Sequence, residues 1–225
     1  MRALLLCLTL TGCWPYISGP FDSDGVDDTS VDGPGGDLIG ELRAGDVELG
    51  SEVEVRDIEV TAVWSLGFYA QDPRGGTSNA GIHVFLDADP PVEVGDRVTV
   101  QGIVGDYFGE LQIEGSDVEV QGDGTGIEPL ILRAIVAADD RWEGMLIRID
   151  GEVTDLNYDC SLDNENCRDQ NLWEVGGDSG LVIWNRCFVG SAWSSLEGQL
   201  PVMGVQTMRF DRRRLMPRSA EDFGG

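Results

Sequence analysis

Residues 67–85 read GFYAQDPRGGTSNAGIHVF: two alternating apolar and polar runs joined by a polar, glycine-rich loop. The alternation predicts two half-buried strands, Gly67–Asp72 and Ala80–Ala88. The same period of two continues in residues 47–63 and 90–120, with a reversal at Gly105–Gly109. Five short strands with short connections and no long helix predict a small β-barrel over residues 46–122.

The second half of the chain repeats this pattern, with four elements in the same order. Residues 143–156 (EGMLIRIDGEVTDL) match 50–63, residues 171–176 match 67–72, residues 180–186 match 81–87, and residues 196–223 match 94–120. An internal repeat of this kind predicts a second barrel over residues 142–225. Residues 123–141 between the repeats predict a linker that begins with glycines and holds one short helix, Pro129–Ala138.

The stretch VEVRDIEVTAV…GFYAQDP…GIHVF…VGDRVTVQGIVGDYFGELQI resembles the OB-fold-like domain that precedes the catalytic domain in secreted bacterial endonuclease/exonuclease/phosphatase-type nucleases. The same module occurs in other exported bacterial proteins. The resemblance covers residues 47–121 well and residues 140–223 more loosely. The expected fold class is all-β, with two tandem five-stranded OB-like barrels, and the resemblance implies no particular activity.

The N-terminal residues MRALLLCLTLTGC have the layout of an export signal, with Arg2 before a short apolar core that cannot span a bilayer. The tetrapeptide before and including Cys13, LTGC, resembles a bacterial lipobox, in which the cysteine is lipidated; an ordinary cleaved signal is the alternative. We expect a signal peptide over residues 1–12 and a disordered acidic tether over residues 13–45. The predicted protein is an exported lipoprotein of the cell envelope, at the outer membrane or cell surface, anchored in the membrane through Cys13.

The charge balance narrows the class of ligand. The chain of 225 residues carries 41 acidic and 15 basic residues, all of the latter Arg, for a formal net charge of −26. Such a chain repels nucleic acid phosphates, which usually bind to basic surfaces. We therefore expect a protein or an oligosaccharide as the ligand. A single-stranded nucleic acid, or a role as the partner of a secreted nuclease, is the alternative.

Catalytic motifs do not emerge from the sequence. The one histidine, His83, lies in the middle of an alternating run, where it is more typical of a strand residue than of a general base. Metal-binding Cys–His spacing, nucleophile elbows and phosphate-binding loops are not found. The sequence predicts a protein that is not an enzyme and needs no cofactor.

The OB resemblance implies a ligand face on the second and third strands of each barrel and the loops around them. A further candidate is the segment 209–218, RFDRRRLMPR, which holds five of the fifteen arginines and would either meet phosphate or neutralise the acidic neighbouring barrel. The candidate ligand residues are Phe68, Tyr69, His83, Phe85, Tyr107, Phe108, Trp173, Trp184, Arg212, Arg213 and Arg214.

The cysteines after Cys13 predict one cross-link. Cys160 and Cys167 flank a short loop, and in an exported protein a disulfide between them would restrain it. Cys187 is then a buried free thiol, although either partner could pair with it instead. The same loop carries candidate Ca²⁺ ligands, and a solvated acidic loop is the other interpretation. These ligands are Asp159, Asp163, Glu165 and Asp169.

Overall fold

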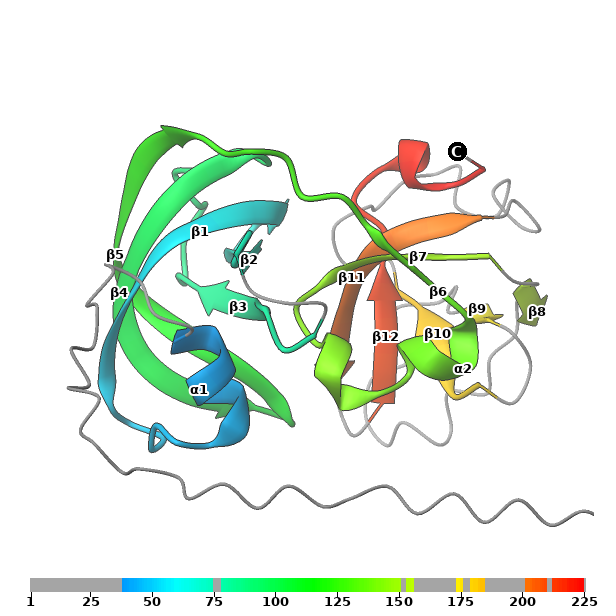
Figure 1. The fold of residues 1–225 in the computed structure, drawn as a ribbon, viewed down its shortest axis with the longest axis horizontal. Helices are drawn as coiled ribbons and strands as arrows, with labels where there is room; N and C mark the ends of the chain where they lie inside the picture. The colour runs from blue at the N-terminus through cyan, green and yellow to red at the C-terminus, as the bar shows by residue number, and fades with distance from the viewer. Residues whose placement is uncertain are drawn as a thin grey trace, which may run out of the picture. The chain divides into compact units, whose positions relative to one another are not determined.

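The computed structural model describes residues 38–74, 78–150, 153–155, 173–175, 179–184, 201–209 and 212–224, all within one compact unit, Asp32–Gly225 (Figure 1). Several predictions fall outside these residues: lipidation of Cys13, the Cys160–Cys167 disulfide, the state of Cys187, and the Ca²⁺ candidates Asp159, Asp163, Glu165 and Asp169. Within the described ranges no helix is long and apolar enough to cross a membrane.

The elements of the first repeat are α1 (Leu38–Ala44), β1 (Glu52–Trp64), β2 (Gly67–Gln71), β3 (Gly81–Phe85), β4 (Asp96–Tyr107) and β5 (Glu110–Asp123). Those of the linker and second repeat are β6 (Leu130–Leu132), α2 (Ala134–Ala137), η1 (Asp140–Trp142), β7 (Leu146–Ile149), β8 (Val153–Asp155), β9 (Trp173–Val175), β10 (Leu181–Ile183), β11 (Val202–Arg209), β12 (Arg212–Met216) and η4 (Ala220–Asp222).

The first repeat forms a closed five-stranded barrel, as the alternating pattern predicts. Its strands follow the order β1-β2-β3-β5-β4, and β4 pairs back on β1. Closure depends on a bulge in β1 between Val55 and Ile58, where Asp57 has a φ of 56°. The bulge bends the strand, so its first half pairs with β4 and its second half with β2.

The predicted tether is too long at its C-terminal end. It extends to residue 45, whereas Leu38–Ala44 form the helix α1. Ile39 and Leu42 lie three residues apart, on one face of this helix, and both are buried in the core cluster that fills the barrel. Burial of this apolar pair explains why an otherwise polar segment becomes helical at its end.

The second repeat and the linker strand β6 together form a seven-stranded sheet, which is not closed over the residues that the structure describes. Its order is β6-β7-β11-β12-β10-β9-β8. The pairings follow those of the barrel: β7 pairs with β11 as β1 pairs with β4, and β10 runs parallel to β12 as β3 runs parallel to β5. The repeat seen in the sequence is therefore a repeat of strand pairing, while two closed barrels are not observed.

The linker departs from its prediction. The expected helix Pro129–Ala138 is replaced by the strand β6, which pairs in parallel with β7, and by the four-residue helix α2. At its start the linker is held by Glu59 of β1, whose buried carboxylate accepts hydrogen bonds from Thr125 N at 2.7 Å and Gly126 N at 2.9 Å. Because a buried carboxylate needs hydrogen-bond donors, these two backbone amides hold the glycine-rich start of the linker against the barrel.

Candidate functional site

The predicted ligand face on β2 and β3 of the barrel is covered, so this prediction needs correction. Phe68 points into the barrel core with 0% of its surface exposed. Tyr69 and His83 are 0% and 1% exposed, and Phe85 is half-buried. Tyr69 packs with residues of the second sheet, among them Trp184 and Val205. Phe68 is enclosed by the barrel core and Tyr69 is covered by the second sheet, so a ligand can reach neither side chain.

A buried polar network fixes this contact. Tyr69 Oη donates to Glu110 Oε1 at 2.6 Å and lies 3.1 Å from Thr207 Oγ1 on β11, which donates to the same carboxylate oxygen. His83 stacks on Tyr69 with ring centroids 4.6 Å apart. Trp64 Nε1 donates to His83 Nε2 at 3.3 Å, so the proton of neutral His83 lies on Nδ1. That nitrogen is 3.3 Å from Glu110 Oε2 but is not aligned with it as a hydrogen bond.

A second buried cluster surrounds Glu143, which precedes β7. Its Oε1 pairs with Arg43 Nη1 of α1 at 2.5 Å, and its Oε2 pairs with Arg213 Nη1 of β12 at 3.0 Å. Leu111 N also donates to Oε1 at 3.0 Å, and Arg213 pairs in addition with Asp140. Arg213, which was predicted to bind a ligand, instead forms ion pairs with Glu143 and Asp140 of the same chain.

The other candidates of the second repeat are also engaged in the fold. Trp184 is buried, and the guanidinium groups of Arg209 and Arg214 lie 5.3 and 5.1 Å from its ring centroid, within cation–π range. Arg214 is buried and Arg212 is half-buried. The Trp173 side chain lies outside the described residues; its backbone pairs with Ile183. The arginine-rich hairpin is therefore no exposed phosphate-binding patch at Arg213 or Arg214.

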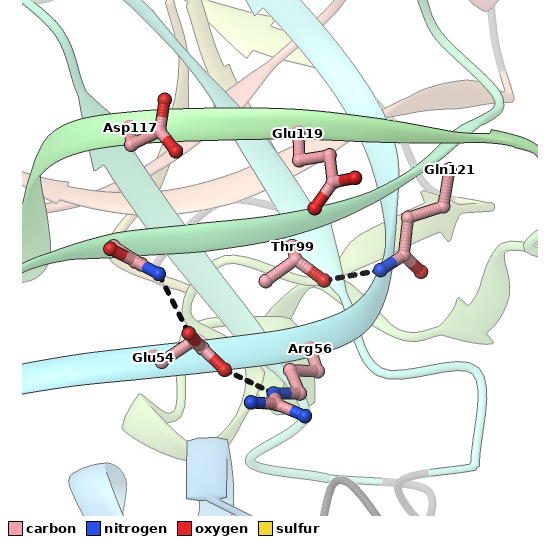
Figure 2. Close-up of a pocket in the computed structure, with 7 residues that line it drawn as sticks. Glu54, Arg56, Thr99, Asp117, Glu119 and Gln121 are labelled. Atoms are coloured by element: carbon pink, nitrogen blue, oxygen red, sulfur yellow. Dashed lines mark hydrogen bonds and ion pairs between the residues drawn. The ribbon is translucent and has the colours of Figure 1, made fainter.

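Among the described residues, a candidate site that is open to solvent lies on the outer face of β1, β4 and β5. A hollow of about 240 Å³ lies there (Figure 2). Its lining is polar throughout and carries three carboxylates and one guanidinium. The lining residues are Glu54, Arg56, Thr99, Gln101, Asp117, Glu119 and Gln121.

Strand register explains why carboxylates gather on this face. Gln101 of β4 lies opposite Glu54 of β1 on one side and opposite Asp117 of β5 on the other. Two residues further along β4, Ile103 lies opposite Glu52 of β1 and opposite Glu114 of β5. Directly opposed residues of antiparallel strands project on the same side of the sheet. We call this surface the acidic face, made of Glu52, Glu54, Thr99, Gln101, Ile103, Glu114, Asp117 and Glu119.

The carboxylates of the acidic face differ in how they are held. Glu54 accepts a hydrogen bond from Arg56 Nε and another from Gln101 Nε2 at 2.7 Å, and these bonds, that of Arg56 first, hold its pKa below the ordinary glutamate value. Among the described residues no hydrogen bond or ion pair reaches the carboxylates of Asp117 and Glu119, and no dashed line reaches them in Figure 2. The exposed carboxylates of Asp117 and Glu119 therefore face solvent beside the carboxylate of Glu54, whose charged form is stabilised by its hydrogen bonds.

The acidic face can attract cations and accept hydrogen bonds from a ligand. Thr99 Oγ1 accepts from Gln121 Nε2, which holds the floor of the hollow in place. In the part of the chain that the structure describes, no group of three or more His, Cys, Asp or Glu residues is arranged to hold a metal ion. The exposed carboxylates, with Gln101 between them, can accept hydrogen bonds from ammonium, guanidinium or hydroxyl groups.

The acidic face is a site that the sequence reasoning missed. The signal was present: acidic residues recur with a period of two at Glu52 and Glu54 and again at Asp117 and Glu119. It becomes a surface only because β1 and β5 both pair with β4. No protein-family model, curated protein or solved structure matches the chain.

Proposed function

We propose that this chain is an exported, lipid-anchored module that binds a protein partner with a basic surface and catalyses no reaction. The observation that carries the proposal is the acidic face, a solvent-exposed hollow with two unpaired carboxylates. The net charge of −26 adds a long-range field that draws cationic partners to the chain.

The same surface favours a protein over the other ligand classes. Sugar rings and bases are held on aromatic side chains in OB-type sites, and none of the seven lining residues is aromatic. Nucleic acid phosphates would meet the carboxylates at Asp117 and Glu119. A secreted nuclease encoded elsewhere is one partner that the sequence resemblance suggests, provided that it carries the basic surface.

We further propose that the second repeat is a barrel of the same OB-like design. Its support is the pairing order, in which β7 and β8 take the places of the two halves of β1. β7 pairs with β11 and β8 pairs with β9, just as β1 pairs with β4 and then β2. If β7 and β8 are one bent strand, the second sheet closes as the first does.

Binding of simple charged probes tests the proposed ligand class. The full chain, released from its anchor by Cys13→Ser, is titrated with pentalysine, pentaglutamate, a chitin oligosaccharide and single-stranded oligothymidine at low and high salt. We expect pentalysine alone to bind, with an affinity that falls as salt is added. Tighter binding of oligothymidine or of the oligosaccharide would reject the protein ligand.

A matched pair of triple variants separates the acidic face from the overall charge. Glu54→Gln, Asp117→Asn and Glu119→Gln together neutralise the hollow. Glu48→Gln, Asp89→Asn and Glu93→Gln remove as many charges from exposed positions elsewhere. The first variant should lose pentalysine binding and the second should keep most of it, whereas equal losses would show that only net charge matters.

A further inference from the structure

The turn between β4 and β5 carries an aromatic residue in an unfavourable backbone conformation. Phe108 and Gly109 are the two residues between the strands, with φ values of 55° and 88°. Two-residue turns with positive φ at both positions favour Asn-Gly, and a phenylalanine at the first position is destabilising. Such strain persists mostly where the side chain serves a function.

The side chain held there is exposed and paired with its neighbour. Phe108 and Tyr107 are 51% and 44% exposed, and their rings pack edge to face with centroids 4.6 Å apart. We call this pair the aromatic tip. Exposed, pre-organised aromatic rings are typical anchors of protein interfaces.

The aromatic tip continues the acidic face along β4. Gln101, Ile103 and Tyr107 are separated by even numbers of residues, so they project from the same side of the strand, and Ile103 is 43% exposed. Gly105 between Ile103 and Tyr107 adds no side chain that would interrupt the track. Tyr107 lies six residues after Gln101, a span of about 20 Å of extended chain.

We propose that the aromatic tip anchors the same partner that the acidic face attracts. The partner segment then carries a row of basic side chains that ends in a large apolar side chain, about 20 Å from the first of them. This inference rests on the proposed function. It adds an apolar anchor to the site, and it gives the direction in which the partner segment runs along β4. The carboxylates beside Gln101 bind the cations, and Tyr107 and Phe108 pack against the apolar group.

Two peptides probe the anchor. The first is the acetylated and amidated peptide Lys-Thr-Lys-Thr-Lys-Gly-Trp, and the second has Ala in place of Trp. The chain that carries Cys13→Ser should bind the Trp peptide about tenfold more tightly than the Ala peptide in fluorescence anisotropy or calorimetry.

The variant Phe108→Asn removes one of the two rings of the aromatic tip without endangering the fold. It installs the Asn-Gly pair that this turn prefers, so its melting temperature should equal or exceed that of the unsubstituted chain. We expect it to lose most of the tenfold preference for the Trp peptide, because only Tyr107 is left to pack against the Trp side chain. Val94→Asn, which removes another exposed apolar side chain, is the control and should keep the tenfold preference.

The remaining outcomes decide against the anchor. If Phe108→Asn keeps the full tenfold preference for the Trp peptide, the aromatic tip is not the anchor, while salt-dependent binding of both peptides would leave the proposed function intact. If neither peptide binds the unsubstituted chain, both proposals fail. If that chain binds both peptides equally but sediments with phosphatidylcholine vesicles through Phe108, the tip contacts a bilayer and the inference is wrong.

Discussion

Tyr69 Oη donates a 2.6 Å hydrogen bond to Glu110 Oε1, so a side chain expected to meet a ligand is instead held by a carboxylate under the second sheet. Both residues are almost completely buried. In OB-type barrels the strands β2 and β3 carry ligands. In this chain they pack against the second sheet, so they join the two modules, the barrel and the second sheet. The proposed ligand site therefore lies on the outer face of the other three strands, β1, β4 and β5.

Replacement of Glu110 should weaken the junction between the modules. Glu110→Gln keeps the size of the side chain but removes a charged acceptor from Tyr69 and Thr207. We expect a loss of about 1–3 kcal/mol in the free energy of unfolding, measured by urea denaturation. Glu114→Gln is the control on the same strand, where the side chain is exposed, and it should change stability by less than about 0.5 kcal/mol. Equal effects of the two substitutions would contradict the role of the network.

The close approach of Gly81 and Gly144 gives a second prediction. Gly144 has a φ of 78°, and a Cβ there would lie 2.5 Å from the carbonyl carbon of Gly81. Gly45 has the same φ but nothing within 4 Å. Gly45→Ala should therefore cost only about 1 kcal/mol from its backbone conformation. Gly144→Ala should cost about 1–3 kcal/mol more, because the backbones of the two modules must separate. Similar denaturation midpoints for both variants would show that this contact is loose.

Titration of Glu54 tests the electrostatics of the acidic face. The hydrogen bonds from Arg56 and Gln101 stabilise the ionised carboxylate, which lowers its pKa from 4.5. As the pH falls, Glu54 should stay charged below pH 4.5, where an ordinary glutamate becomes protonated. Its contribution to stability is complete above pH 4.5, declines as the pH falls below that value, and is gone once the pH passes the lowered pKa. Carbon-13 NMR of the Glu54 carboxyl should show this midpoint. Arg56→Gln should raise it, and Arg97→Gln, which removes an equal charge with no bond to Glu54, should leave it nearly unchanged.

The lipid anchor is tested by fractionation. Cys13→Ser removes the acyl acceptor of the lipobox, so the protein should move from the membrane fraction to the soluble fraction. Labelling with radioactive palmitate should mark the unsubstituted chain and spare the variant. Cys7→Ser lies within the expected signal and should leave both readouts unchanged. An unaltered membrane fraction of Cys13→Ser would exclude the lipoprotein.

Local patterns in the sequence predict the strands well because alternation reports which side chains avoid water. It separates Phe68, which fills the barrel, from Tyr69, which points out of it. It cannot tell whether an outward side chain meets solvent or another sheet, since that depends on residues far along the chain. Arg213 shows this most clearly, because its partner Glu143 lies 70 residues earlier.

The candidate site could be predicted only in part for the same reason. Tyr107 and Phe108 were expected at a reversal, and they lie exposed at the β4–β5 turn. The acidic face was not foreseen, because its two lines of carboxylates belong to β1 and β5. Only the intervening strand β4 brings Glu54 and Asp117 to either side of Gln101.

The helix α1 has a mechanical consequence if the chain is anchored through Cys13 as proposed. Any pull from that side enters the described fold at Leu38. It is resisted first by Ile39 and Leu42 in the barrel core and then by Arg43, which holds Gly81 O at 2.8 Å and the Glu143 carboxylate. A force applied to the N-terminus is therefore divided between the barrel and the second sheet. The contacts of α1 must break before that force can separate β1 from β4.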